Sequence, residues 1–175
     1  MNSDFAPTQS PSGGFDPVDL RLLALLQHDA AQSNLALAAA AGVSPATALR
    51  RVRRLVEAGV IERQVALLAP QAVGVPLAAL VEVTLDRQGA EHLDAFEARA
   101  VAEPRVQQAW RVSPGPDFVL VVQVADMAAY HALAQRLFTQ DANVRNVKAY
   151  FSVKRAKFET ALPLPGHAGA APAPA

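Results

Sequence analysis

Cysteine is absent from this 175-residue chain, and that absence excludes several classes of site. Without cysteine the chain can form no disulfide framework, no iron–sulfur cluster and no thiolate zinc site. The histidines do not compensate, because the four of them (28, 92, 131 and 167) lie far apart and follow no metal-ligand spacing. We therefore predict neither a bound metal nor another cofactor.

Long apolar runs are also missing. The longest, Leu35 to Val43, is too short to cross a bilayer, and the first residues lack the basic region and apolar core of a secretory signal. Charged residues make up only 18% of the chain, with 16 Lys and Arg against 16 Asp and Glu. We expect a cytoplasmic protein whose affinity for any polyanion comes from a local patch.

Such a basic patch lies in residues 44–63, where five arginines (50, 51, 53, 54 and 63) accompany only two glutamates. Ser44 is placed to cap a helix that Gly59 ends. Helical spacing brings one polar set of side chains to the same face. The members of that face are Thr47, Arg50, Arg51 and Arg54. We predict that this face contacts DNA and that Arg53, which points off it, faces water; a merely solvated basic helix is the competing interpretation.

The elements before the basic helix fit the same interpretation. Apolar residues at three-to-four spacing predict helices over about 17–28 and 34–41. Gly42 then supplies the left-handed conformation of a tight turn. Two helices joined in this way, the second of them basic, are typical of a helix-turn-helix. Alternating residues over 60–68 predict a strand, and residues 70–76 predict a linker.

After residue 76 the period of the apolar residues changes. The predicted elements are strand 77–85, helix 90–102, strand 106–112, strand 118–124, helix 127–139 and strand 144–153. This order is that of a ferredoxin-like fold. Because its helices cover only one face of the sheet, we expect a second copy of the chain to cover the other.

The predicted fold class is therefore α+β, with a winged helix-turn-helix domain followed by a ferredoxin-like βαββαβ domain. The predicted bounds are a disordered extension over 1–15, a DNA-binding domain over 16–63, a strand and linker over 64–76, the ferredoxin-like domain over 77–160 and a mostly disordered tail over 161–175.

Specific motifs accompany this order of elements. Asp16-Pro-Val-Asp19 opens the first helix. The turn and the basic helix contain Leu37, Ala38, Gly42, Val43, Ser44, Arg51, Val52, Arg54, Leu55, Glu57, Gly59 and Ile61. The second half contains Asp117-Phe118 before a valine-rich strand, Asp126-Met-Ala-Ala-Tyr130 at a helix start, and a closing Leu162-Pro-Leu. In these motifs residues 15–164 resemble the Lrp/AsnC family of feast/famine transcriptional regulators.

The resemblance implies a sequence-specific DNA-binding regulator rather than an enzyme. It implies a homodimer that assembles to an octamer and a small-molecule effector such as an amino acid. Arg51, Arg54 and Ser44 are carried over as DNA-facing; with Thr47 and Arg50 from the same helix face they form the predicted DNA site. The predicted effector-binding residues are Ser113, Asp117 and Met127.

Alternatives stay open at the effector loop and for the function. Asp117 follows a turn and fits a cap on backbone N–H groups equally well, and Met127 fits core packing. Pro114 stands where the family has a glycine, and this proline fixes φ and alters the loop.

The alternative function is that of a siroheme decarboxylase-like enzyme on the same fold. Those enzymes carry Trp- and His-containing motifs, whereas this chain has one tryptophan with no histidine near it.

Overall fold

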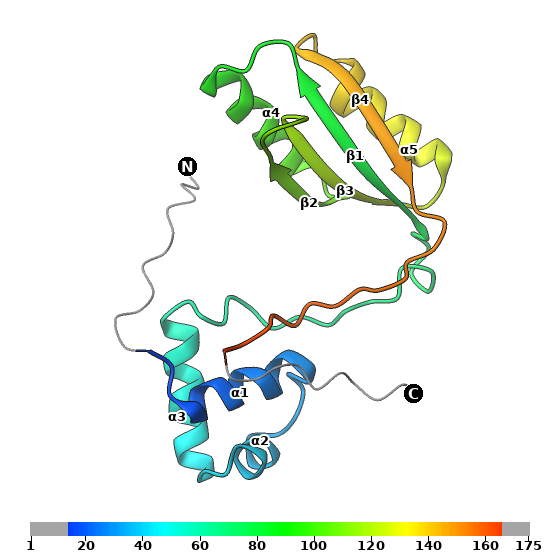
Figure 1. The fold of residues 1–175 in the computed structure, drawn as a ribbon. Helices are drawn as coiled ribbons and strands as arrows, with labels where there is room; N and C mark the ends of the chain where they lie inside the picture. Colours follow the sequence, from blue (N-terminus) through cyan, green and yellow to red (C-terminus); the bar gives the residue numbers. More distant parts are fainter. Residues whose placement is uncertain (1–13, 166–175) are drawn as a thin grey trace. The chain divides into compact units, whose positions relative to one another are not determined.

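The computed structural model of the chain describes residues 14–165 (Figure 1). The disorder predicted for residues 1–13 of the N-terminal extension, and for the tail beyond residue 165, concerns residues outside the described part. The chain divides into two compact units. One contains the residues up to Ala66 together with those from Phe158 onward, and the other contains Leu67–Lys157. No helix of the described part is long and apolar enough to cross a membrane.

Three helices build the first unit, and each begins where a side chain caps it. They are α1 (Pro17–His28), α2 (Asn34–Ala41) and α3 (Pro45–Glu57). The caps are Asp16, Ser33 and Ser44, whose side-chain oxygens accept hydrogen bonds from backbone N–H groups of the first turn. The predicted helix bounds agree with these, because a capping side chain and a three-to-four repeat locate a helix well from sequence alone.

The core of the first unit is small and joins all three helices. Its buried members are Leu22, Leu37, Ala38, Ala41 and Ala48. Between α2 and α3, Gly42 takes a φ of 72°, the left-handed conformation predicted for the turn. Asn34 Nδ2 donates a hydrogen bond over 2.9 Å to the carbonyl of Pro45, which ties the start of α2 to the start of α3.

The last described residues, predicted as part of a disordered tail, belong to this first unit. The backbone N–H of Leu162 donates to Gln27 Oε1 over 2.6 Å, and Gln27 Nε2 donates back to the Leu162 carbonyl over 3.3 Å. A side-chain amide can satisfy both backbone groups of one residue in this way. The closing Leu162-Pro-Leu motif is thereby held against α1.

The strand predicted over residues 60–68 is wrong for a single chain. Residues 62–69 have no regular secondary structure. A strand needs a neighbour to pair its N–H and C=O groups, and the alternating apolar residues here have no such partner in the described chain. Val65, Leu67 and Leu68 are 63%, 62% and 69% exposed. The apolar residues do alternate in this segment, but in a single chain their side chains are exposed to water.

The second unit has the predicted ferredoxin-like order. Its elements are β1 (Leu77–Leu85), α4 (Ala90–Ala102), β2 (Val106–Arg111), β3 (Phe118–Val124), α5 (Met127–Ala134), a π-helical extension of α5 (Gln135–Thr139) and β4 (Val144–Phe151). The four strands form an antiparallel sheet in the order β2-β3-β1-β4. The predicted elements match these within two residues at each end.

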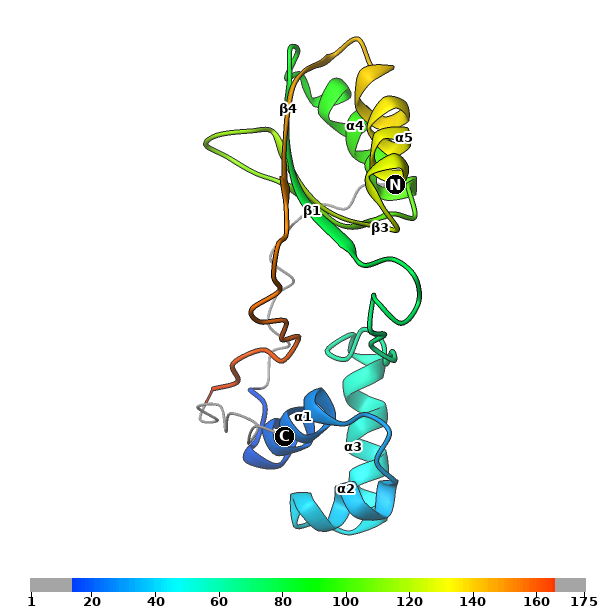
Figure 2. The ribbon, with the colours of Figure 1, turned by 90° about the vertical axis from the view of Figure 1, so that its right-hand side faces the viewer.

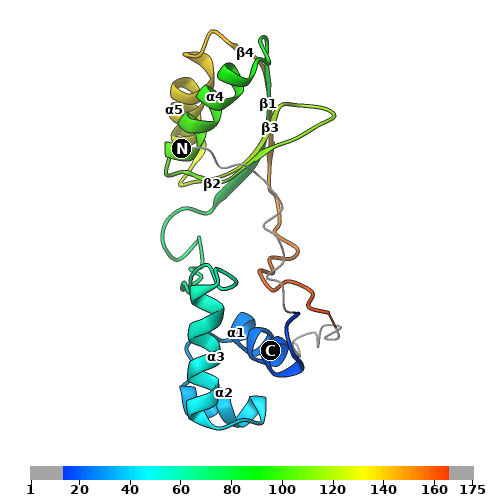
Figure 3. The same cartoon turned by 90° about the vertical axis from the view of Figure 1, so that its left-hand side faces the viewer.

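Helices α4 and α5 lie on one face of this sheet, as Figures 2 and 3 show from opposite sides. Alternate residues of the central strands β1 and β3 point into the core beneath the helices. The fully buried ones include Val81, Val83, Phe118, Leu120 and Val122. Phe96 of α4 and Leu133 of α5 close the core from the helix side. This one-sided core leaves the other sheet face without a cover from the described chain.

Candidate functional site

The basic helix α3 starts at a well-formed cap. Ser44 Oγ accepts from the backbone N–H of Thr47 over 3.2 Å and lies 2.9 Å from Thr47 Oγ1. Pro45 occupies the first turn, where a missing N–H costs no hydrogen bond. The helix buries Ala48 and Leu55 against the first unit. Its remaining surface carries the four arginines, and they fall into two groups.

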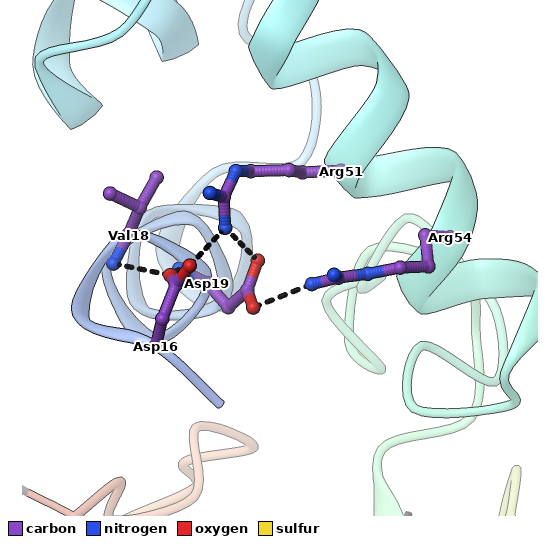
Figure 4. Close-up of polar contacts among 5 residues, drawn as sticks. All are labelled: Asp16, Val18, Asp19, Arg51 and Arg54. Carbon is purple, nitrogen blue, oxygen red and sulfur yellow. Dashed lines mark hydrogen bonds and ion pairs between the residues drawn. The ribbon is translucent and has the colours of Figure 1, made fainter. Parts of the chain in front are cut away.

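Arg51 belongs to the group that turns toward α1. Its Nη1 lies 2.5 Å from Asp16 Oδ2 and 2.9 Å from Asp19 Oδ1 (Figure 4). The side chain is only 19% exposed, and its Nε is buried with no hydrogen-bond partner among the described residues. This position corrects the prediction that the Arg51 guanidinium faces outward. The residue spacing predicted the helical repeat of α3, but it did not predict which side of the helix contacts α1.

The electrostatics at this contact reinforce the charged forms of both partners. The backbone N–H of Asp19 and the guanidinium of Arg51 both donate to Asp16, and they hold the pKa of its carboxyl below the ordinary value. The two carboxylates in turn raise the pKa of Arg51. Both shifts favour the charged forms of Asp16 and Arg51.

Arg54 belongs to the same group but is less enclosed. Its Nη2 lies 2.5 Å from Asp19 Oδ2, on the opposite carboxylate oxygen from Arg51. The Arg54 side chain is 54% exposed, whereas that of Asp19 is 4% exposed. Among the described residues of this unit, Asp19 is the charged residue that is buried. We call the set Asp16, Asp19, Arg51 and Arg54 the α1–α3 ion-pair cluster.

Arg50 and Arg53 form the second group. Both are exposed, and no hydrogen bond or ion pair joins either of them to another described residue. They share an exposed row of α3 with Ala46 and Leu49, and Leu49 is 43% exposed. Arg53 is exposed, as the sequence predicted, whereas Arg51, which the sequence placed on the outer face, turns toward α1. The two aspartates three residues apart at the start of α1, Asp16 at its cap and Asp19 in its first turn, were the available signal for this orientation of Arg51.

The loop before β3 brings two of the predicted effector residues together. Ser113 precedes a cis peptide bond to Pro114, and Gly115 has a φ of 125°. Asp117 Oδ2 accepts from the backbone N–H of Leu85 over 2.7 Å, and the Asp117 backbone bonds to Val83 and Val112. Asp117 thus performs the backbone-capping role that was left open, at the junction of β1 and β3. The β2–β3 connection projects on the side of the sheet away from the helices (Figures 2 and 3).

Met127 does not join Ser113 and Asp117 within one chain. It opens α5 after β3, whereas Asp117 stands immediately before β3. The seven residues of β3 separate the two ends by roughly 20 Å at strand rise. Met127 is 43% exposed, so it is not a core residue in the single chain. A pocket containing all three residues requires more than one copy.

A shallow recess lies elsewhere in the second unit, between the π-helical turn and β4. Phe138, Thr139, Val144, Arg145, Asn146 and Val147 line it. None of the predicted effector residues is among them. Across residues 14–165 no group of three histidine, aspartate or glutamate side chains is placed to hold a metal ion.

The uncovered sheet face has an apolar patch at its centre, bordered by Glu82 of β1 and Lys148 of β4. Strand register places Leu80 of β1 between Val121 of β3 and Tyr150 of β4, with all three on this face. Leu80 and Tyr150 are 48% and 52% exposed, and Trp110 of β2, beside Val119, is 54% exposed. Half-exposed large apolar residues in one patch are typical of an interaction surface.

A capped helix-turn-helix with a basic third helix, followed by a ferredoxin-like domain, defines a DNA-binding transcriptional regulator with an appended ligand-binding domain. The comparisons with known proteins agree on both halves. A model described as winged helix-turn-helix DNA-binding matches residues 15–62, and one described as the Lrp/AsnC ligand binding domain matches residues 78–162. The chain belongs to the Lrp/AsnC family, and it is a transcriptional regulator of that type.

Similar proteins cover nearly the whole chain. A leucine-responsive regulatory protein of Rhizobium meliloti is 37% identical over 81% of this chain and 91% of its own length. The crystal structure of an AsnC family transcriptional regulator from Agrobacterium tumefaciens has a TM-score of 0.82 at 32% identity, covering 86% of this chain and 98% of that one. A transcriptional regulator from Neisseria meningitidis, solved as a complex with L-methionine, has a TM-score of 0.81 at 27% identity, covering 86% and 97%.

Proposed function

We propose that the first unit binds duplex DNA through α3, with the start of that helix in the major groove. The observation that carries this proposal is the capped α2–α3 turn, which leaves Ser44, Thr47 and Arg50 at the accessible start of a basic helix. Arg54 remains part of the proposal as a phosphate contact at the edge, because its side chain is half exposed. Arg51 drops out as a direct contact, since its guanidinium is engaged by Asp16 and Asp19.

The assembly we propose is a homodimer formed through the uncovered sheet face. Its support is the apolar patch of Leu80, Trp110 and Tyr150, which a second copy would remove from water. Two recognition helices in a dimer fit two half-sites about one helical turn apart. The family resemblance supports the further association of dimers into octamers.

The effector we propose is an amino acid bound between copies of the chain, near Ser113, Asp117 and Met127. The distance between the two ends of β3 favours a site shared between chains. A similar regulator from Neisseria meningitidis was solved with L-methionine, which makes that amino acid a sensible first probe. A ligand at such an interface would shift the balance between assemblies and so the DNA-bound state.

The regulator hypothesis is preferred over the siroheme decarboxylase-like enzyme. The similar proteins described above are named as regulators, and the capped basic helix has no use in an enzyme of that kind. Because a regulator works where the DNA is, we propose the cytoplasm as its location.

The DNA-binding proposal is tested by selection from a random duplex library with the full-length protein, followed by fluorescence anisotropy on the selected duplex at several salt concentrations. We expect affinity to fall linearly with the logarithm of salt concentration, because binding releases counterions from the phosphates. Discrimination against a scrambled duplex should reach at least about a thousandfold. Failure to enrich any sequence, with no salt-dependent binding, would contradict the proposal.

A further inference from the structure

One row of α3 is exposed along the helix and differs from the face predicted by spacing. Ala46, Leu49, Arg50 and Arg53 recur at three and four residues and are all exposed. The predicted row began one residue later, at Thr47, and included Arg51 and Arg54. One residue of a helix corresponds to a rotation of about 100°. The accessible face is therefore turned by that amount from the predicted face.

Charge is distributed unequally between these two rows. Arg51 and Arg54 are paired with two aspartates of α1, so the α1–α3 ion-pair cluster carries no net charge. Arg50 and Arg53 are paired with no described residue. The carboxylate on their side of the helix is Glu57, which lies at the C-terminal end and forms no ion pair with Arg53. The free positive charge of α3 thus lies on the exposed row.

The chemistry of the row also suits base edges. Leu49, 43% exposed, sits between Ala46 and the two free arginines. An aliphatic side chain in the major groove can contact the thymine methyl group, while arginine donates to guanine or to phosphate. A small residue such as alanine near the start of the helix allows a close approach to the bases. A merely solvated helix face gains nothing from an exposed leucine at its centre.

Arg51 acts behind this row. Its guanidinium joins α3 to both aspartates at the N-terminus of α1, and its buried Nε places the side chain inside the unit. Together with the burial of Ala48 and Leu55, this contact stabilises the rotation of α3 in which the row faces outward.

We propose that the DNA-reading surface of α3 is the row Ala46–Leu49–Arg50–Arg53, with Arg53 as a direct DNA contact and Arg51 as a positioning residue held by Asp16 and Asp19. The inference rests on the proposed function, because it assigns residues to the DNA contact of the same helix. It adds to that function a specific role for Arg53 and for Arg51.

The test measures the slope of binding against salt for single variants of the full-length protein on the duplex selected by the wild type. Arg53→Ala should weaken binding about tenfold and reduce the salt slope by about one, the signature of one lost phosphate contact. Arg53→Lys should restore the slope. Leu49→Ala should lower the preference for the selected over the scrambled duplex about fivefold while leaving the slope unchanged. Arg87→Ala, which removes an exposed charge in the second unit, is the matched control and should change neither quantity.

Arg51→Ala distinguishes positioning from contact. It should weaken binding while leaving the salt slope at the wild-type value, because no phosphate contact is lost. Arg51→Lys, which can keep an ion pair with Asp19, should recover most of the affinity, and it replaces the alanine variant if thermal melting shows that the latter is unfolded.

Two outcomes would overturn the inference. One is wild-type affinity and slope in Arg53→Ala; the other is a slope reduced by about one in Arg51→Ala. If the wild type itself selects no duplex, the proposed function fails instead, so the two failures are distinguishable.

Discussion

The carboxylate of Asp19 lies 2.9 Å from the guanidinium of Arg51, and this contact links the first helix of the DNA-binding unit to its third. Asp19 is 3% exposed. A buried carboxylate is costly unless it is paired, so its two arginines are a condition of the fold as well as a brace for α3. In the proposed positioning role of Arg51, the same contact connects stability with DNA recognition.

Asp19→Asn should therefore destabilise the first unit strongly. The substitution keeps the shape of the side chain but removes the buried charge that both arginines face, and breaking such a pair costs about 3 kcal/mol. Urea unfolding followed by helical circular dichroism measures the change. Glu62→Gln, at an exposed glutamate with no partner among the described residues, serves as the control and should unfold like the wild type. Equal midpoints for Asp19→Asn and the wild type would show that the ion-pair cluster does not stabilise the unit.

Asp16 gives the first unit a defined dependence on acid. Its pKa in the folded protein is below the ordinary 3.8, because the Asp19 N–H and Arg51 stabilise the carboxylate. A carboxyl group whose pKa is lowered by folding stabilises the folded state above pH 4, and this stabilisation is lost as the pH falls through the pKa of the folded state. Asp16→Asn retains a capping side chain but cannot titrate. The melting temperatures of wild type and variant should differ at pH 6 and converge as the pH falls through the folded pKa of Asp16; a constant difference would exclude this linkage.

Ser44 and Arg51 show which features of α3 could be predicted from the sequence and which could not. The Ser44 cap and the apolar repeat located α3 to within a residue or two, because local hydrogen bonding decides where a helix starts. The orientation of Arg51 depends on a partner 35 residues earlier in the chain, which periodicity does not register. The strand predicted over 60–68 failed for a similar reason: alternation marks a residue pattern, and pairing requires a neighbour.

Asp117 separates structural from ligand-binding roles in the second unit. Asp117→Ala removes the acceptor for the N–H of Leu85, a residue that is 1% exposed. An unsatisfied buried N–H costs about 1–3 kcal/mol, which corresponds to a fall in melting temperature of several degrees for a domain of this size. Asp117→Asn keeps an oxygen acceptor and should melt close to the wild type.

The same two variants also report on the effector in a thermal-shift panel of the twenty amino acids that includes L-methionine. If Asp117 binds the effector through its charge, Asp117→Asn should retain wild-type stability but lose the ligand-induced shift. An unchanged shift in that variant would limit Asp117 to its contact with Leu85. A wild type that responds to none of the twenty would contradict the amino-acid effector.

The uncovered sheet face predicts a dimer that a single charge disrupts. Leu80 lies at the centre of this face, between Val121 and Tyr150, so Leu80→Asp would place a carboxylate in the apolar interface, where it would have to be desolvated. Sedimentation should give the mass of a dimer, or of an octamer built from such dimers, for the wild type and a loss of that dimer for the variant. Trp110, the one tryptophan, shares the face, and its emission should shift to the red in the variant as water reaches it.

The control for that experiment is Val101→Asp. Val101 is also an exposed apolar residue, 69% accessible, but it lies on α4 on the opposite side of the sheet. It should leave both the mass and the emission unchanged. If Leu80→Asp keeps the mass of the wild type, the sheet face is not the dimer interface. If it yields monomers that still bind the selected duplex with wild-type affinity, the pairing of two recognition helices on one DNA site is wrong, because a monomer has only one helix to place in the groove.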